Sequence, residues 1–463
     1  NSLAWEGIDY DDDPWVFNAS RPYFPTAGLS NRHISLWASH GRYYCNDLRR
    51  WKWQRPNLFG TTEDLFTQTI VVPYLIPMLQ NAGAIVFTPR ERDWQKHEVI
   101  VDNDDAFKRP YYVETVNGKK WKDCDSIGFA ARRRYYEDNQ NPFTDGTIRK
   151  AKATKKKNHS EISYQPDLPE AGKYAVYVSY QSLPKSVTDA KYIVYHKGEA
   201  TEFSVNQRMG GGTWVYLGTF DFDKGCNTLN RVVVTNQASK RGVVTSDAVR
   251  FGGGMGNILR GNNSSGMPRC LEGARYYAQW AGAPYHVYGG RKGANDYADD
   301  INTRSLMTNW LGGGSPYMPA LQGKKVPIEL SLAVHSDAGY NKDGKTTWGS
   351  LAICTTNFND GMLNSGISRM TSKDLAKALL KNLVSDLRQQ YGEFSERYLW
   401  DRNYSETRLP EVPAAIIETL SHQSFPDMKI GQDPMGKFTI ARSLYKTILR
   451  YVCTNHGLPY VVQ

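Results

Sequence analysis

The spacing of apolar residues changes twice along this chain, and these changes constrain its fold more than any other feature. Between Lys173 and Phe251, apolar side chains recur at every second position, as in Tyr174, Val176 and Val178. Runs of this kind follow one another at short intervals, separated by turns rich in Gly, Pro and Asn, and no helical stretch intervenes. This pattern predicts an all-β sandwich of about 100 residues.

Outside this segment, apolar strands alternate with helical stretches. The predicted elements are one strand ending at His335, strands at 33–38, 84–88, 351–355 and 412–418, and helices at 63–81, 268–281, 298–310, 372–391 and 437–456. This alternation predicts an α/β fold, with a mostly parallel sheet flanked by helices. The predicted domains are therefore a first α/β part at 1–148, an inserted sandwich at 149–254 and a second α/β part at 255–463.

Local signals refine the first long helix. Thr61 and Asp64 have the spacing of a capping box at its start. Pro73 and Pro77 lie inside it, and each removes a backbone donor and crowds the preceding turn, so we expect a kink or a break there.

The chain carries a net charge of +10, which favours anionic partners. Much of the excess lies between Arg149 and Lys157, at the predicted domain boundary, where a solvated linker is the stronger interpretation and a binding patch the weaker one. RNA-recognition motifs and Cys/His finger spacings are absent, so nucleic acid is not an expected partner.

No apolar run approaches the roughly 18 residues that a membrane span needs, so none is expected. The chain begins Asn1-Ser2-Leu3-Ala4-Trp5, which does not read as a signal peptide. Either the protein is cytosolic or a leader is absent from this chain. The six cysteines form no CxxC pair, which excludes the usual zinc-finger and redox spacings.

Two histidines stand where apolar strands turn polar. His335 follows the run from Pro327 to Val334, and His40 follows the strand that begins at His33. Strand tips of this kind open into the crevice of an α/β sheet. With Glu63 at the start of the next helix, they form a ligand set for a catalytic zinc with one open position. The alternatives are ordinary surface histidines, and an acidic residue favoured by the helix dipole.

Glu418 ends another apolar strand, which begins at Pro413. Burying a carboxylate alone is costly, so it must face a polar crevice or a partner. Beside a zinc ion it would serve as general base. The alternative is a structural ion pair with an arginine.

These segments resemble the zinc-dependent N-acetylmuramoyl-L-alanine amidases of the amidase-3 type, which cleave peptidoglycan. The likeness rests on Ser39-His40-Gly41 with Thr62-Glu63-Asp64-Leu65, on Leu330 to Ala338, and on Pro413 to Glu418. It implies a phosphorylase/hydrolase-like α/β fold. It also implies His40, Glu63 and His335 as ligands of Zn²⁺, and Glu418 as the catalytic residue.

Three further residues are candidates for substrate contact. Arg304 looks like an arginine that this family carries on the helix before the second histidine strand. His422 lies four residues after Glu418 and could contact substrate or compete as a ligand, and His286 is a weaker candidate of the same kind. The sequence departs from the family with Trp37-Ala38-Ser39 before His40, and with Ser336-Asp337 after His335.

The predicted sandwich has a likeness of its own. The segments at 171–178, 212–220 and 245–251 resemble golvesin-type domains, which also occur in xanthan lyase-like proteins. Glycan contact through this sandwich is a further expectation, based on its aromatic residues.

Together these features predict an amidase that cleaves the bond between N-acetylmuramic acid and L-alanine, outside the cytoplasm: periplasmic, at the cell surface or secreted. The alternatives are a metal-dependent hydrolase or lyase on another polysaccharide or peptide, and a glycan-binding protein with a vestigial site.

Overall fold

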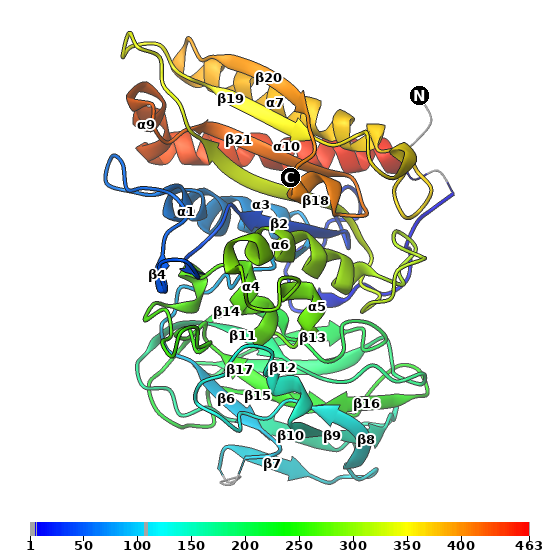
Figure 1. Ribbon diagram of the computed structural model, residues 1–463. Coiled ribbons are helices and arrows are strands. Elements are labelled where there is room, and N and C mark those ends of the chain that lie inside the picture. The colour runs from blue at the N-terminus through cyan, green and yellow to red at the C-terminus, as the bar shows by residue number, and fades with distance from the viewer. Residues whose placement is uncertain (1–4, 6, 106–109, 463) are drawn as a thin grey trace.

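The computed structural model describes residue 5, residues 7–105 and residues 110–462. The stretch Asn1 to Ala4, on which the expectation about a signal peptide was based, lies outside the described residues. Figure 1 shows a sheet with helices at one end of the molecule and a β-rich part at the other, with a group of short and medium helices between them. The described residues contain no helix long and apolar enough to cross a membrane.

The six-stranded sheet has the order β20-β19-β21-β18-β2-β5. Its strands are β2 (His33–Ala38), β5 (Ile85–Phe87), β18 (Ile328–Asp337), β19 (Ser350–Cys354), β20 (Glu396–Asp401) and β21 (Ala414–Ser421). Neighbours β20/β19, β21/β18, β18/β2 and β2/β5 run parallel, and β19/β21 run antiparallel. Strands from both ends of the chain therefore meet at the centre, where β2 and β18 lie side by side.

Helices cover both faces of this sheet. Leucines and valines of β18 at alternate positions (Leu330, Leu332, Val334) pack in one core with α7 (Met370–Tyr391) and α10 (Pro434–His456). The other face meets α6 (Asp296–Gly312), where the hydroxyls of Ser35 and Thr308 lie 2.7 Å apart. Further helices are α4 (Ala274–Trp280), α5 (Tyr285–Tyr288), α8 (Ser405–Arg408) and α9 (Phe425–Gln432). The short 3₁₀ turns are η2 (Pro142–Thr144), η3 (Arg269–Leu271) and η4 (Asn359–Gly361).

The helix predicted over 63–81 is broken, as its prolines require. It consists of α1 (Glu63–Phe66), α2 (Gln68–Ile70), a π-helical turn η1 (Val71–Leu75) and α3 (Ile76–Asn81). The capping residue is Thr62, whose hydroxyl accepts from the backbone of Leu65, and not Thr61 as the spacing suggested. The long loop after β2 also contains a small hairpin, β3 (Tyr43–Cys45) and β4 (Arg50–Lys52).

Two larger sheets of the β-rich part pack face to face. A six-stranded sheet has the order β1-β13-β12-β15-β10-β7, and a four-stranded sheet has the order β14-β11-β17-β6. Their facing side chains share one core that includes Val176, Tyr192, Phe203 and Phe222. A three-stranded sheet, β16-β9-β8, adjoins them. The strands are β1 (Val16–Asn18), β6 (Val99–Asp102), β7 (Tyr112–Thr115), β8 (Lys122–Gly128), β9 (Gly146–Lys152), β10 (Glu161–Tyr164), β11 (Gly172–Val178), β12 (Ala190–His196), β13 (Glu199–Val205), β14 (Val215–Phe222), β15 (Arg231–Thr235), β16 (Val243–Ser246) and β17 (Ala248–Phe251).

These sheets reach back beyond residue 149. Strand β6 pairs with β17, β7 pairs with β10, and β8 pairs with β9, while β1 from the start of the chain pairs with β13. The interpretation of the lysine-rich stretch as a solvated linker is wrong for its first part, because Arg149, Lys150 and Lys152 lie in β9. All six cysteines are free thiols, and Cys354 and Cys453 are buried.

The cores of the two parts are continuous. Leu311, Val326 and Ile328 of the α/β part belong to the same buried cluster as the sandwich interior. A second cluster joins Trp214 of the β-rich part to Trp280 of α4, with ring centroids 6.3 Å apart. Among the described residues, the two parts are therefore joined by buried apolar contacts.

Candidate metal centre

Parallel pairing brings the two predicted histidine strands together. Ala38 of β2 lies opposite Val334 of β18, so that His40, two residues after Ala38, comes close to His335. Their ring centroids are 5.4 Å apart. His335 lies inside β18 and not at its tip, because the strand continues to Asp337. Glu63 is the first residue of α1, which the Thr62 hydroxyl caps.

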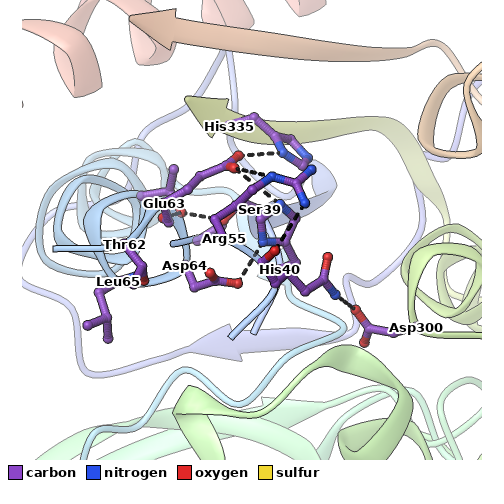
Figure 2. A network of polar contacts seen from close by, with 12 residues as sticks. Ser39, His40, Arg55, Thr62, Glu63, Asp64, Leu65, Asp300 and His335 are labelled. Atoms are coloured by element: carbon purple, nitrogen blue, oxygen red, sulfur yellow. Dashed lines mark hydrogen bonds and ion pairs between the residues drawn. The ribbon is translucent and has the colours of Figure 1, made fainter. Parts of the chain in front are cut away.

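The carboxylate of Glu63 lies between the two imidazoles (Figure 2). Its Oε1 is 3.0 Å from His335 Nδ1, and its Oε2 is 3.3 Å from His40 Nε2. One ligand atom from each of the three residues lies within 4.8 Å of the others, and all three side chains are buried. The structure therefore brings together the three residues that the sequence predicts as metal ligands.

Each imidazole is held through its other nitrogen by a second carboxylate. His40 Nδ1 lies 2.6 Å from Asp64 Oδ1, and His335 Nε2 lies 3.0 Å from both oxygens of Glu406. Carboxylates in these positions fix ring orientation and leave the opposite nitrogen free to bind a metal. Sequence reasoning missed both. Asp64 was visible as the neighbour of Glu63, but nothing in the sequence points to Glu406 on α8.

Glu406 is itself anchored by two donors. Arg304 donates to its Oε1 at 2.8 Å, and the Trp37 indole donates to its Oε2 at 2.5 Å. Arg304 also binds Asp300 at 2.7 Å and is 1% exposed, so it holds Glu406 in place and does not lie open to a substrate. Trp37, one of the residues at which this sequence departs from the amidase pattern, therefore has Glu406 as its hydrogen-bond partner.

The charges of this network are coupled. Burial lowers the pKa of His335, but Glu406 and Glu63 outweigh it and raise that pKa to about 10. Burial raises the pKa of Glu406, but His335 and Arg304 outweigh it and hold that pKa at about 2. The site therefore stabilises positive charge between its carboxylates, as a cation-binding site does.

The donor set fits zinc. Two imidazole nitrogens and one carboxylate are common catalytic zinc ligands. His40 Nε2 is buried and makes no well-formed hydrogen bond in the described residues; its nearest charged group is Glu63 Oε2, at 3.3 Å. A cation bound by Glu63 would satisfy it.

Glu418 lies next to this group. It is opposite His335 in the register of β21 and β18, so the two side chains project from the same face of the sheet. Its Oε2 is buried without a hydrogen-bond partner in the described residues. Burial raises its pKa to about 7. A carboxyl group with a pKa near neutrality can both accept and donate a proton.

Arg55 is a residue of this site that sequence reasoning missed. Its Nε lies 3.4 Å from Glu63 Oε2, and its side chain is 37% exposed. Figure 2 shows it next to Glu63 and His40. It belongs to the loop between β4 and α1. A half-open guanidinium here can contact an anionic or carbonyl group of a ligand.

The other two residues predicted to contact substrate, His422 and His286, lie in different places. His422 is buried near the site, with its Nδ1 3.0 Å from the hydroxyl of Ser336, and its Nε2 has no hydrogen-bond partner among the described residues. His286 is exposed on α5, and no contact joins it to His40 or Glu63 in the part of the chain that the structure describes.

The loop that carries His40 is fixed from outside the sheet. The buried guanidinium of Arg90 donates to the carbonyls of Ala38 and His40, at 2.5 and 2.9 Å, and to that of Glu272. A Cβ on Gly41 would come within 2.5 Å of the backbone of Glu272. Only glycine therefore fits after His40.

Residues 137–253 match the family model of the Golvesin C-terminal domain. A xanthan lyase of Bacillus sp. (strain GL1) is 34% identical over 97 residues, which are 20% of this chain and 10% of that protein. The chain thus spans about a tenth of the curated relative it matches. The predicted likeness of the inserted segment to golvesin-type and xanthan lyase-like domains is confirmed.

Similar solved structures come from two groups of proteins. Paenibacillus xanthan lyase is 24% identical, covering 33% of this chain and 13% of that one, with a TM-score of 0.26. An N-acetylmuramoyl-L-alanine amidase of Clostridium difficile 630 is 18% identical, covering 27% and 57%, with a TM-score of 0.21. An amidase of the same name from Mycobacterium smegmatis is 16% identical, covering 33% and 60%, with a TM-score of 0.23.

Proposed function

We propose that this protein is a zinc-dependent amidase of the amidase-3 type, which hydrolyses the bond between N-acetylmuramic acid and L-alanine in peptidoglycan. The observation that carries the proposal is the convergence of His40, Glu63 and His335 within 4.8 Å, beside Glu418. Such a donor set leaves a fourth position open for a reacting group. The motifs around these residues, which resemble those of the amidases, support the choice of bond.

Each residue then has a stated task. When bound, zinc polarises the amide carbonyl and makes water more acidic. Glu418 accepts a proton from the water that attacks the carbonyl carbon. As the carbon–nitrogen bond breaks, it returns this proton to the amino group of alanine. Asp64 and Glu406 keep the two imidazoles oriented.

The substrate places the protein outside the cytoplasm, so we propose a periplasmic, cell-surface or secreted location. Glycan contact through the sandwich belongs to the same proposal. A cavity of about 740 Å³ between β5 and β14 supports it, because the exposed Phe24 and the half-buried Tyr216 and Phe220 are among its lining residues. Aromatic rings offer flat apolar surface against which a sugar ring can pack.

The test is zinc content together with release of stem peptide from intact peptidoglycan. The wild type should hold about one zinc per chain. His335→Ala should lose both zinc and activity, and Glu418→Gln should keep zinc and lose activity by at least about 100-fold. His286→Ala, which removes an exposed histidine, should keep both and serves as the matched control.

Two results would redirect the proposal. Zinc without peptide release would keep the metal site and assign it to another hydrolase or lyase reaction. An absence of zinc in protein never exposed to a chelator would overturn the ligand assignment and favour a glycan-binding protein.

A further inference from the structure

The β-rich part carries a strongly basic hollow, far from the candidate metal centre. This cavity of about 710 Å³ is lined by the lysines Lys119, Lys120, Lys122, Lys150, Lys152 and Lys185. Arg208 and Arg241 complete its charge. We call these eight residues the basic hollow. Figure 1 shows β8, β9 and β16, which form its floor, at the end of the molecule away from the six-stranded sheet.

The hollow collects cations from separate parts of the chain. Lys119 and Lys120 precede β8, Lys122 lies on it, and Lys150 and Lys152 lie on β9. Three loops supply the rest: Lys185 between β11 and β12, Arg208 after β13, and Arg241 before β16. The charge is therefore a product of the fold, and it does not come from a single run of lysines.

The arrangement places like charges directly opposite each other. Lys122 and Lys150 are register partners on the antiparallel strands β8 and β9. Like charges in this position destabilise a sheet. Lys152 lies on the same side of β9 as Lys150, because side chains two residues apart share a face.

On the other face of β9, the cation Arg149 is paired with carboxylates. Arg149 binds Glu114, with Nε 2.6 Å from Oε1, and also contacts the carboxylate of Asp123. In the described residues, no carboxylate lines the basic hollow, and none of its eight cations forms an ion pair. On one face of β9 the charge of Arg149 is therefore balanced by carboxylates of the protein. On the other face Lys150 lies opposite Lys122, and their repulsion is not balanced.

We infer that the basic hollow binds an acidic polysaccharide, whose carboxylates supply the missing countercharge. Lysines on flexible stems suit a chain of spaced single charges, whereas phosphate recognition favours the planar fork of arginine. Pro184 and Val243 add small apolar surfaces between the cations. No aromatic side chain of the described residues lines the hollow, so it offers no platform for stacking nucleic-acid bases.

This inference does not rest on the proposed amidase activity. The hollow uses none of the residues around Glu63, and binding should be the same in the Glu418→Gln variant. A failure of the amidase proposal would therefore leave it standing, and the reverse also holds.

The test is binding of polygalacturonate to the whole chain by calorimetry at low and moderate salt. The wild type should bind it, should not bind neutral dextran, and should lose affinity steeply as salt rises, since charge contacts of this kind are screened. The double variant Lys122→Gln with Lys150→Gln should bind about tenfold more weakly or worse, by the counter-ion argument for polyanions.

Its matched control is Lys173→Gln with Lys224→Gln, which removes two exposed lysines of the same part outside the hollow. This control should bind as the wild type does. Thermal unfolding checks the fold, and the Lys122 and Lys150 variant should not melt lower, because a repulsion has been removed. Should it fail to fold, Lys152→Gln replaces it, since that side chain is exposed.

Equal binding by wild type and hollow variant would overturn the inference. So would an equal loss in the control variant, which would indicate general charge attraction. Tighter binding of duplex DNA than of polygalacturonate, with the same dependence on Lys122 and Lys150, would reassign the hollow to nucleic acid.

Discussion

His40 and His335 each present one ring nitrogen to Glu63 and the other to a second carboxylate. This symmetry assigns tasks to individual atoms. The nitrogens that face Asp64 and Glu406 orient the rings, and those that face Glu63 remain for a metal ion. Orienting carboxylates of this kind raise the basicity of the histidine as well.

Replacing Glu406 with Gln tests this assignment. The amide keeps an acceptor for Arg304 or Trp37 but loses the charge that His335 faces, so zinc should bind about 10- to 100-fold more weakly. Competition with a chromophoric chelator measures this affinity. Glu396→Gln, a carboxylate paired with Lys381 at the surface, should bind zinc as the wild type does. Unchanged affinity in Glu406→Gln would mean that His335 needs no such support.

At this scale the sequence singled out four residues that the structure brings close together, and it missed the carboxylates Asp64 and Glu406 that contact the two histidines. His40, Glu63, His335 and Glu418 stand out because each is a polar residue beside an apolar strand or at a helix start. Glu406 lies on a single helical turn with no periodic pattern, and only the packing of α8 against the sheet brings it to His335.

Among the elements, the loop after β2 is the most tightly constrained. Arg90 binds its carbonyls, and Gly41 lies against the backbone of Glu272. An added methyl group cannot be accommodated unless the backbone moves, and such a movement shifts His40.

Gly41→Ala should therefore be destabilised by about 1–3 kcal/mol, the usual cost of overpacking, and should bind zinc more weakly. Thermal unfolding and zinc titration measure the two effects. Gly290→Ala is the control, because its added Cβ would meet nothing nearer than 3.6 Å. Equal melting temperatures in both variants would show that the loop can move aside without cost.

The connection between β16 and β17 holds a buried carboxyl group, Asp247. Its Oδ2 accepts from the backbone of Phe129 and from the Ser179 hydroxyl, both at 3.0 Å. Burial nevertheless raises its pKa to about 8. The folded state therefore binds a proton that the unfolded state has already released between about pH 4 and pH 8.

The free energy of unfolding should fall as the pH rises from about 4 to about 8, by at most about 1.4 kcal/mol per pH unit. The Asp247→Asn variant has no carboxyl group to ionise at this position, so its free energy of unfolding should depend less on pH than that of the wild type. Urea unfolding of both proteins at pH 5, 6, 7 and 8 makes the comparison. Parallel curves would mean that Asp247 is ionised in the fold throughout.

Strand prediction succeeded where apolar residues alternate and failed where they do not. The sandwich strands between 172 and 251 were evident from their period of two. Strand β8 reads Lys-Asp-Cys-Asp-Ser-Ile-Gly, with little apolar alternation, and it is held by pairing with β9. Its assignment depends on a partner strand that a local pattern does not reveal.

On the scale of the whole molecule, the β-rich part and the α/β part share one hydrophobic core. The β-rich part includes β1, which precedes β2 of the α/β sheet in the chain, as well as strands that follow β5. Leu311 and Ile328 of the α/β part belong to its core. Parts that share a core lose it together.

The protein should therefore unfold in one calorimetric transition, with equal calorimetric and van't Hoff enthalpies. Deletion of residues 149–254 should give insoluble protein, since β6, β7 and β8 would lose their partners β17, β10 and β9. Two separate transitions, or a soluble deletion variant with native-like circular dichroism, would contradict this.

The distance in sequence between the proposed ligands has a consequence for synthesis. Glu63 and His335 are separated by 272 positions. Because synthesis runs from the N-terminus, His40 and Glu63 leave the ribosome well before His335 does. Under the proposed ligand assignment, zinc can bind only after β18 has folded against β2. A chain cut before His335 would lack one proposed ligand and would have no amidase activity, although the basic hollow would still be present in its sequence.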